Sequence, residues 1–346
     1  MRYQKLGRTG LFVSEVCLGT MTYGGKGFWA MMGDLGLDEV AGQLQAAVDA
    51  GVNFIDTANV YHEGESERLV GAAIARLGLR RESLVLATKA RGRTGPGPND
   101  AGLTRKHLLA SIDASLQRLG TDYVDLYQIH GVDRATPLEE TVQALGDIVR
   151  SGKVRYVGFC NLPAWTAMKA LAIADRLGVA RFVSGQMYYS IAGRDIEREI
   201  APLAQDEGLA ILPWSPLAGG LLSGKFSADA KGPEGARRTS FDFPIVDKNR
   251  AFACVDAMRL IAQAHGSSVA QVALAYLLQK PFVTSVIIGA RTQAQLVDNL
   301  SATKLILSSE QLATLDAVSA LPTEYPGWMV DWQNGRDQNS DGSSRR

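Results

Sequence analysis

Short apolar runs rich in β-branched residues alternate with longer amphipathic stretches along most of the chain. In the stretch 104–119, for example, Leu108, Ile112 and Leu119 recur near helical spacing and form one inward-facing stripe. Such alternation predicts strand–helix units that assemble a parallel sheet. The predicted strands are Val16–Met21, Asn53–Ala58, Leu84–Lys89, Val124–His130, Arg155–Asn161, Phe182–Met187, Ala210–Ser215 and Val283–Gly289.

The stretches between these strands predict helices. Those with the clearest pattern are Asp38–Ala50, Ser66–Leu77, Thr104–Leu119, Leu138–Ser151 and Pro163–Leu177. Eight strands, each followed by a helix, predict an α/β fold of the closed (β/α)8 or TIM-barrel type rather than an open sheet. A Gly7–Gly10 turn between two short apolar stretches predicts an N-terminal β-hairpin ahead of the first barrel strand.

Two long segments interrupt the regular alternation. The first is the glycine-rich loop Tyr23–Gly36, and the second is Leu217–Lys248 after the seventh strand. Long loops inside compact domains are usually functional or disordered. Because these two loops are rich in apolar residues, we expect them to contribute to a functional site. No linker divides the chain, so we expect one barrel domain over residues 1–332 and a polar, flexible tail over 333–346.

Composition narrows the class of function. Hydrophobic residues make up 46% of the chain and charged residues 21%, which is ordinary for a globular enzyme. Thirty-six basic residues balance 36 acidic ones, with no basic block, so a nucleic-acid partner is not expected. No secretory segment and no run of 18 apolar residues occurs, so we expect a cytoplasmic protein without membrane association. The three cysteines and four histidines lack metal-ligand spacing, so no metal site is expected.

Four residues with reactive side chains lie at or just beyond the carboxyl ends of three neighbouring strands. Asp56 lies near the end of the second strand and Tyr61 follows it, Lys89 ends the third strand, and His130 ends the fourth. Reactive side chains of such barrels project from this end, and adjacent strands lie about 5 Å apart. The sequence therefore predicts that the four side chains converge on one site.

The four residue types together suit proton transfer. A tyrosine, with its ordinary pKa near about 10, is a poor proton donor or acceptor at neutral pH, and an adjacent ammonium is expected to lower that pKa. Lys89 can supply this ammonium, Asp56 can hold it charged, and His130 can hydrogen-bond a substrate oxygen or relay a proton to Tyr61. None of these groups carries electrons, so redox chemistry requires a cofactor.

Each of the four residues also has an ordinary structural interpretation. Taken singly, Lys89 is a surface lysine, His130 a satisfied structural histidine, and Asp56 a turn or helix cap. These interpretations are independent of one another, whereas one shared site explains all four positions. We therefore favour the site.

The segment Gly51–Glu67, with the sequence GVNFIDTANVYHEGESE, closely resembles the signature of the aldo-keto reductase family around its catalytic aspartate and tyrosine. The similarity extends over about Met1 to Leu321. Further motifs match in the same order: Ala87–Lys89, Asp125–His130, Gly152–Gly158, Trp214–Leu217 and Ile288–Arg291. One such motif is moderately specific, whereas the ordered set is very specific.

The resemblance implies a general-acid role for Tyr61, with Lys89 and Asp56 tuning it and His130 orienting the substrate or relaying a proton. It also implies an NADP(H) site built without a Rossmann fold, which agrees with the lack of an early G-x-G-x-x-G motif. For the nicotinamide end the matching residues are Asn161, Gln186 and Trp214. For the pyrophosphate and adenosine they are Ser215, Leu217, Gly219, Lys225, Gly289, Arg291, Gln295 and Asn299.

One position departs from the family pattern. Cys160 precedes Asn161 where the family often has serine, and a thiol is a weaker hydrogen-bond partner. Core packing is the simpler role for this cysteine.

Apolar residues in the first loop and near the C-terminus are expected to wall the substrate pocket. They are Tyr23, Phe28, Trp29, Met32 and Trp328. No cluster of basic side chains on these segments calls for an anionic substrate, so we expect a bias towards apolar or ring-containing carbonyls. The alternative for Trp328 and Trp332 is packing against the barrel or a second subunit, as in a homo-oligomer.

The expected function is an NADP(H)-dependent oxidoreductase that reduces aldehydes or ketones and also oxidises secondary alcohols. Its partner is a small-molecule carbonyl or alcohol. Two rivals are kept. One is a nucleotide-binding regulatory module, like the potassium-channel β-subunits that resemble the family, and the other is a barrel lyase with Lys89 as Schiff-base nucleophile.

Overall fold

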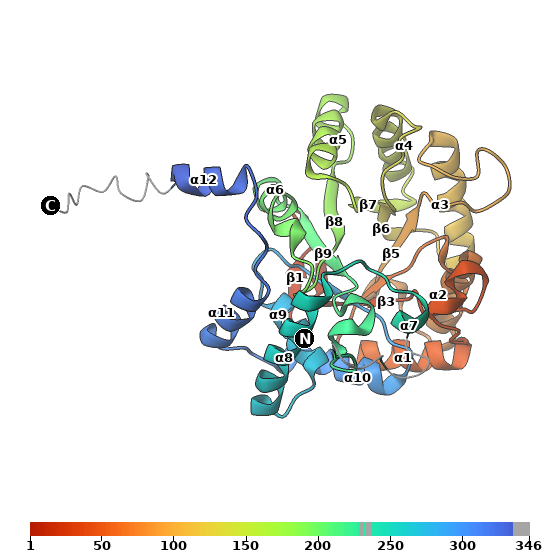
Figure 1. Cartoon of the computed structure of the whole chain (residues 1–346). Helices are drawn as coiled ribbons and strands as arrows, with labels where there is room; N and C mark the ends of the chain where they lie inside the picture. Colours follow the sequence, from red (N-terminus) through yellow and green to blue (C-terminus); the bar gives the residue numbers. More distant parts are fainter. Residues whose placement is uncertain (228–231, 233–236, 335–346) are drawn as a thin grey trace.

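Eight parallel strands form one barrel sheet surrounded by helices in the computed structural model, which describes residues 1–227, 232 and 237–334 (Figure 1). The sheet order is β10-β3-β4-β5-β6-β7-β8-β9, so neighbours in the sheet follow the chain. Its strands are β3 (Val16–Gly19), β4 (Phe54–Asp56), β5 (Val85–Ala90), β6 (Val124–Ile129), β7 (Val154–Cys160), β8 (Phe182–Tyr188), β9 (Ala210–Trp214) and β10 (Val286–Ile288).

The seam between β9 and β10 is joined by a parallel bridge that pairs Ile211 with Val283. Beside it the backbone N–H of Thr284 donates to the carbonyl oxygen of Ile211 at 2.9 Å. The sheet is therefore a nearly closed barrel, and the predicted (β/α)8 fold is confirmed. The first, second and eighth strands, β3, β4 and β10, are shorter than the predicted runs.

The predicted N-terminal hairpin is present and covers the amino-terminal end of the barrel. It consists of β1 (Tyr3–Lys5) and β2 (Phe12–Ser14), paired antiparallel with Gln4 opposite Val13. Leu6 and Val13 are fully buried and pack with interior strand residues such as Phe54 and Leu126. This hairpin therefore supplies core side chains that close the barrel at the end opposite the candidate site.

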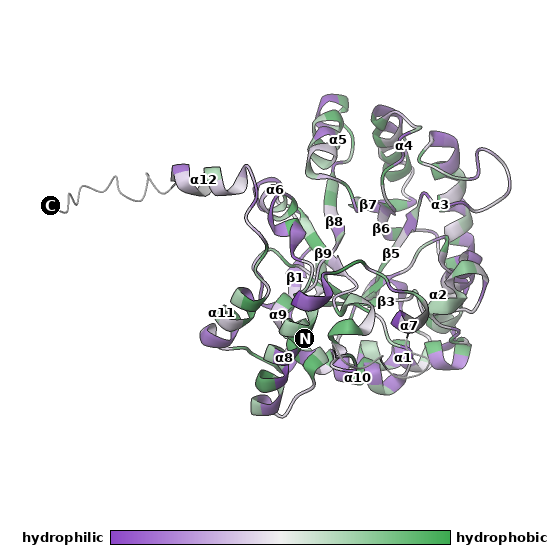
Figure 2. Cartoon of the chain, viewed as in Figure 1, coloured by the Kyte–Doolittle hydropathy of each residue, from purple (hydrophilic) through white to green (hydrophobic). Residues whose placement is uncertain are grey.

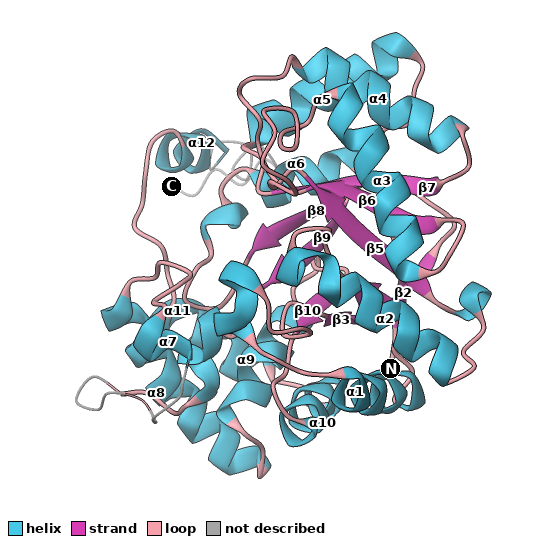
Figure 3. Ribbon diagram, turned by 90° about the vertical axis from the view of Figure 1, so that its right-hand side faces the viewer, coloured by secondary structure: helices cyan, strands magenta, loops and turns pink. Residues whose placement is uncertain are grey.

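Helices cover the outside of the sheet, with strands inside and helices outside in Figure 3. Figure 2 shows polar positions on the outer faces of the same helices. The five helices predicted above begin and end within one residue of the prediction. At the start of the helix Arg105–Leu119, the Thr104 hydroxyl accepts a hydrogen bond from the His107 N–H and caps the helix. The five helices are α1 (Leu37–Asp49), α2 (Glu65–Arg76), α3 (Arg105–Leu119), α4 (Leu138–Arg150) and α5 (Ala164–Leu177).

The second half of the chain is less regular. Between β8 and β9 lies α6 (Ile200–Glu207), whereas the connection from β9 to β10 holds the 3-10 helix η5 (Ala218–Ser223), α7 (Arg237–Ser240), α8 (Lys248–His265) and α9 (Val269–Leu278). After β10 come α10 (Gln293–Ser301), α11 (Ser309–Val318) and α12 (Gly327–Asn334). Helix α12 projects from the body of the molecule (Figure 1).

Most of the predicted tail, residues 335–346, lies outside the described residues, as do 228–231 and 233–236 of the second long loop. Among the helices that the structure describes, none combines the length and apolar character needed to cross a membrane.

Candidate active site

A buried lysine lies at the centre of the residues gathered at the carboxyl ends of β4, β5 and β6. The ammonium nitrogen Nζ of Lys89 lies 2.5 Å from Oδ2 of Asp56 and 3.2 Å from the hydroxyl oxygen of Tyr61. A third acceptor, the carbonyl oxygen of Thr57, lies 2.8 Å away. All three donors of the ammonium are therefore used, and one of its bonds is with the Tyr61 phenol.

Lys89 remains charged in this setting. Burial alone opposes the charged form, but the adjacent Asp56 carboxylate and the Tyr61 hydroxyl outweigh it and raise the pKa of Lys89 above its ordinary value. A Schiff-base nucleophile needs a neutral amine. The paired, charged state of Lys89 therefore argues against the lyase interpretation.

The pKa of Tyr61 differs from the sequence-based expectation. Lys89 does lower it, but burial of the phenol has the larger effect, so the pKa of Tyr61 lies above its ordinary value. The cation is visible in the sequence, whereas the low-dielectric surroundings, which disfavour the phenolate, are not. Tyr61 is therefore a protonated phenol at neutral pH.

His130 follows β6 and lies beside Tyr61, with ring centroids 5.7 Å apart and an edge-on arrangement. Burial, Lys89 and Arg91 lower the pKa of His130 well below its ordinary value. The imidazole is therefore neutral at neutral pH, which suits a hydrogen bond to a substrate oxygen better than a supply of protons.

The second oxygen of the Asp56 carboxylate is bound by two glutamine side chains. Oδ1 of Asp56 accepts from Nε2 of Gln128 at 3.0 Å and from Nε2 of Gln186 at 2.9 Å. Gln128 was missed by the sequence analysis, and it also lies 3.9 Å from the Cys160 sulfur. The available signal was an amide within the otherwise apolar end of β6, which is fully buried.

The residues matched to the nicotinamide end lie next to this cluster. Nε1 of Trp214 donates to Oδ1 of Asn161 at 2.9 Å, and the Asn161 N–H donates to the carbonyl oxygen of Gln186 at 3.1 Å. Asn161 has a φ of 53°, in the left-handed region. Amide groups and a half-exposed indole next to the Asp56–Lys89 pair fit a flat ring that carries a carboxamide, so the residues present fit a nicotinamide cofactor.

The segment after β9 contains the residues matched to the pyrophosphate. The Ser215 hydroxyl accepts from the Gly219 N–H at 3.0 Å, and Gly220, with a φ of 93°, faces open space where a Cβ would lie. Leu217 is half-buried and Lys225 exposed. A turn without side-chain atoms on its open side permits close approach of a phosphate to the backbone.

The residues matched to the adenosine end lie at and after β10. The Arg291 guanidinium donates to the carbonyl oxygens of Met31 and Met32, at 2.7 and 3.1 Å, and thus binds the first loop. Oε1 of Gln295 accepts from the Arg291 N–H at 2.9 Å. Asn299 is buried rather than part of a solvated face, whereas Gly289 is exposed.

A chain of aromatic contacts lines the region from Tyr61 to Trp214. The Trp29 ring packs against Tyr61 at 4.9 Å, and Phe28 contacts both Trp29 and Phe241. Phe243 then stacks on Trp214 with centroids 5.8 Å apart. Phe241 and Phe243 were not predicted from the sequence, because they lie about two hundred residues from the loop they contact.

Three further residues predicted for the substrate wall have these surroundings. Tyr23 is buried, with its hydroxyl donating to Oε1 of Gln43 at 3.1 Å, and Met32 is buried as well. Trp328 lies on the projecting helix α12, half-exposed and in contact with Tyr325. Phe28 and Trp29 remain at the site.

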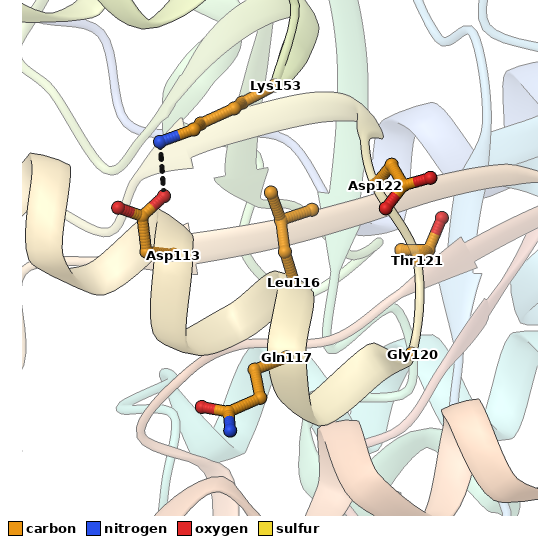
Figure 4. A pocket seen from close by; sticks show the side chains of 7 residues that line it. All are labelled: Asp113, Leu116, Gln117, Gly120, Thr121, Asp122 and Lys153. Carbon is orange, nitrogen blue, oxygen red and sulfur yellow. Dashed lines mark ion pairs between the residues drawn. The ribbon is translucent and has the colours of Figure 1, made fainter.

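A separate hollow of about 460 Å³ lies near the start of β6 and β7 (Figure 4). Its lining residues include Asp113 and Lys153, which form an ion pair at 2.6 Å. Functional sites of such barrels lie at the opposite, carboxyl end of the strands. No group of three or more potential metal ligands occurs in the described part of the chain.

Comparison with known proteins agrees with the geometry. A family model described as "Aldo/keto reductase family" matches residues 15–320. The chain is 34% identical to the versiconal hemiacetal acetate reductase of Aspergillus parasiticus, over 94% of this chain and 99% of that protein. It is 37% identical to the norsolorinic acid reductase stcV of Emericella nidulans, over 92% and 81%. It is also 37% identical to a probable voltage-gated potassium channel subunit beta of Oryza sativa, over 92% and 96%.

Proposed function

Because the chain belongs to the aldo/keto reductase family, we propose that it is an NADP(H)-dependent oxidoreductase that reduces aldehydes or ketones to alcohols. The observation that carries the proposal is the contact of the charged Lys89 ammonium with the Tyr61 hydroxyl, beside residues that fit a nicotinamide. Relatives named as reductases support the same reaction class.

The four residues divide the proton chemistry between them. Bound NADPH would supply a hydride for the carbonyl carbon. Tyr61 then donates its phenolic proton to the carbonyl oxygen, and Lys89 stabilises the phenolate that remains. Asp56 keeps Lys89 charged and oriented, while the neutral His130 donates a hydrogen bond to the substrate oxygen.

The cofactor is proposed to lie across the carboxyl ends of β7 to β10. Asn161 and Gln186 would hold the carboxamide, and Trp214 would stack on the nicotinamide ring. Backbone groups after β9 would hold the pyrophosphate, and the Arg291 guanidinium, next to the N-terminus of α10, would favour a 2′-phosphate. These assignments follow from the family resemblance and the fit of the residues.

Ring-bearing or otherwise apolar carbonyls are the proposed substrates. The support is the row of aromatic side chains between Tyr61 and Trp214, to which Phe28, Trp29, Phe241 and Phe243 contribute. Oxidation of secondary alcohols uses the same groups in reverse, and it requires Tyr61 to accept a proton.

The test is NADPH consumption by the purified protein with a panel of aldehydes, ring ketones, sugars and sugar phosphates, repeated with NADH. We expect turnover with ring-bearing carbonyls and a lower KM for NADPH than for NADH. Exclusive use of charged sugars would contradict the substrate proposal, and turnover of none of the carbonyls would contradict the reductase proposal.

A second candidate function is a nucleotide-binding regulatory module. It is favoured by the relative named as a probable potassium channel subunit beta, which matches almost over its whole length. Tight NADPH binding without turnover across the panel would support this module. The intact set of Asp56, Tyr61, Lys89 and His130 favours the enzyme.

A further inference from the structure

His62, which directly follows Tyr61, is a buried histidine outside the proposed proton chemistry. Its backbone lies in the left-handed region, with φ 49° and ψ 39°. Residues other than glycine rarely adopt this backbone conformation, and they keep it where surrounding contacts hold them in place. At His62 these contacts are made by the imidazole ring.

The ring binds the backbone of the first loop at three points. Nδ1 lies 2.9 Å from the Gly25 backbone nitrogen and 3.2 Å from that of Lys26. Nε2 lies 2.9 Å from the carbonyl oxygen of Met21. Because backbone N–H groups only donate and a carbonyl only accepts, Nδ1 is unprotonated and Nε2 carries the hydrogen. The imidazole is therefore a neutral tautomer that uses both of its nitrogens.

The loop is shaped to receive this ring. Gly24 has a φ of 133°, and a Cβ at this position would lie 2.6 Å from Cβ of His62. Only glycine therefore allows the loop backbone to approach His62 so closely.

The segment held by His62 runs directly into the aromatic wall. Gly25 and Lys26 precede the 3-10 helix η1 (Gly27–Met32), which carries Phe28 and Trp29. Arg291 binds the far end of η1 through the Met31 and Met32 carbonyls. Trp29 then packs on the ring of Tyr61. His62 thus links the turn of the proposed proton donor to the loop that would contact the substrate.

We propose that His62 is a positioning residue that sets selectivity for ring-bearing carbonyls by holding the first loop, and with it Trp29, against the Tyr61 turn. The selectivity part rests on the proposed reductase function, whereas the holding of the loop does not.

The experiment compares His62→Gly with His62→Asn. Glycine suits the left-handed backbone but leaves the Gly25 and Lys26 amides without their acceptor. Asparagine tolerates the same backbone and carries Oδ1 near the position of Nδ1. Lys26→Ala is the matched control, because it removes the exposed ion pair with Glu65 and keeps the backbone N–H.

Two readouts decide the proposal. Hydrogen–deuterium exchange of the peptide that covers residues 24–27 should speed up about tenfold in His62→Gly and stay near wild type in His62→Asn and Lys26→Ala. In His62→Gly the KM for a bicyclic aromatic ketone should rise about tenfold, while kcat with propanal changes less than about twofold. His62→Asn should restore most of the lost KM.

Unchanged exchange in folded His62→Gly, or accelerated exchange in His62→Asn equal to that in His62→Gly, would overturn the proposed holding of the loop. An equal KM increase for propanal and the ketone would overturn the selectivity role. Absence of turnover in the wild type would contradict the proposed function instead, and the exchange data would still decide whether His62 holds the loop.

Discussion

Lys89 shows how a buried charge serves a site rather than the stability of the fold. Its side chain and that of Asp56 are almost completely buried. The free energy lost by removing two charges from water is about as large as the free energy gained from their attraction, whereas removing one partner leaves an uncompensated buried charge. The pair is therefore explained by what the ammonium does for Tyr61.

Replacing Lys89 with methionine is expected to lower the free energy of unfolding by about 3–5 kcal/mol, because Asp56 would remain buried and charged. The double variant Asp56→Asn/Lys89→Met should recover most of that loss, since it buries no net charge. Urea denaturation of both variants measures this. Equal destabilisation of the single and double variants would show that lost packing, not unpaired charge, dominates.

The pH dependence of catalysis follows from the directions of two pKa shifts. Tyr61 acts as an acid, and its raised pKa keeps it protonated through neutral pH. The lowered pKa of His130 keeps the imidazole neutral over the same range. We therefore expect kcat/KM for carbonyl reduction to be flat around neutral pH and to fall only above about pH 10, while alcohol oxidation increases with pH. A loss of reduction already at mildly alkaline pH would contradict the raised pKa of Tyr61.

Elements were easier to predict than contacts between them. The helix over Arg105–Leu119 and the presence of a strand around Phe54–Asp56 follow from local periodicity, which needs no knowledge of partners. The contact of Phe28 with Phe241, and the bonds of Gln128 and Gln186 to Asp56, depend on how distant segments meet. The residue types alone do not specify which distant segments come into contact.

The turn between Tyr61 and α2 depends on Gly64. Its φ is 85°, and an added Cβ would lie 2.7 Å from Cδ of Arg118. Arg118 cannot move freely, because its Nε binds Oε2 of the buried Glu67 at 2.6 Å. The position of Tyr61 is thus fixed partly from the helix layer behind it.

Gly64→Ala is therefore expected to destabilise the protein by more than about 1 kcal/mol and to lower kcat by displacing Tyr61. Gly78→Ala is the matched control, since Gly78 also has a positive φ of 60° but open space around a Cβ. It should cost about 1 kcal/mol and leave kcat unchanged. Thermal unfolding and steady-state kinetics of the pair distinguish steric contact from backbone strain. Similar effects of the two substitutions would argue against a role for the Arg118 contact.

The aromatic row joins the first loop to the segment after β9. Phe243→Ala should raise the KM for ring ketones several-fold, because truncating this partly exposed phenylalanine removes about 1 kcal/mol of apolar contact. Trp328→Ala should leave that KM unchanged, because α12 projects away from the barrel. Kinetics with one ring ketone and propanal test both variants. A larger effect of Trp328→Ala would restore the role that the sequence analysis gave this residue.

At the scale of the whole molecule, the barrel class was predictable because eight strand–helix units each leave a local signal. The connection from β9 to β10 was not, since it contains two full helices, α8 and α9, where one was expected. The sequence also could not predict whether the pKa of Tyr61 is raised or lowered, because the shift depends on how deeply the folded barrel buries the phenol. The barrel fold thus follows from the hydrophobic pattern of the sequence, whereas the pKa values at the site depend on how the side chains pack in the folded protein.

Tyr61 is proposed to donate the proton when a carbonyl is reduced at the expense of NADPH, and every other role at the site depends on this one. The most direct measurement compares wild type and Tyr61→Phe for NADPH binding, by fluorescence titration, and for NADPH oxidation with a ring-bearing carbonyl. We predict unchanged binding and a loss of about 10²–10⁴-fold in kcat/KM for the variant. NADPH oxidation by Tyr61→Phe at the wild-type rate would contradict the account.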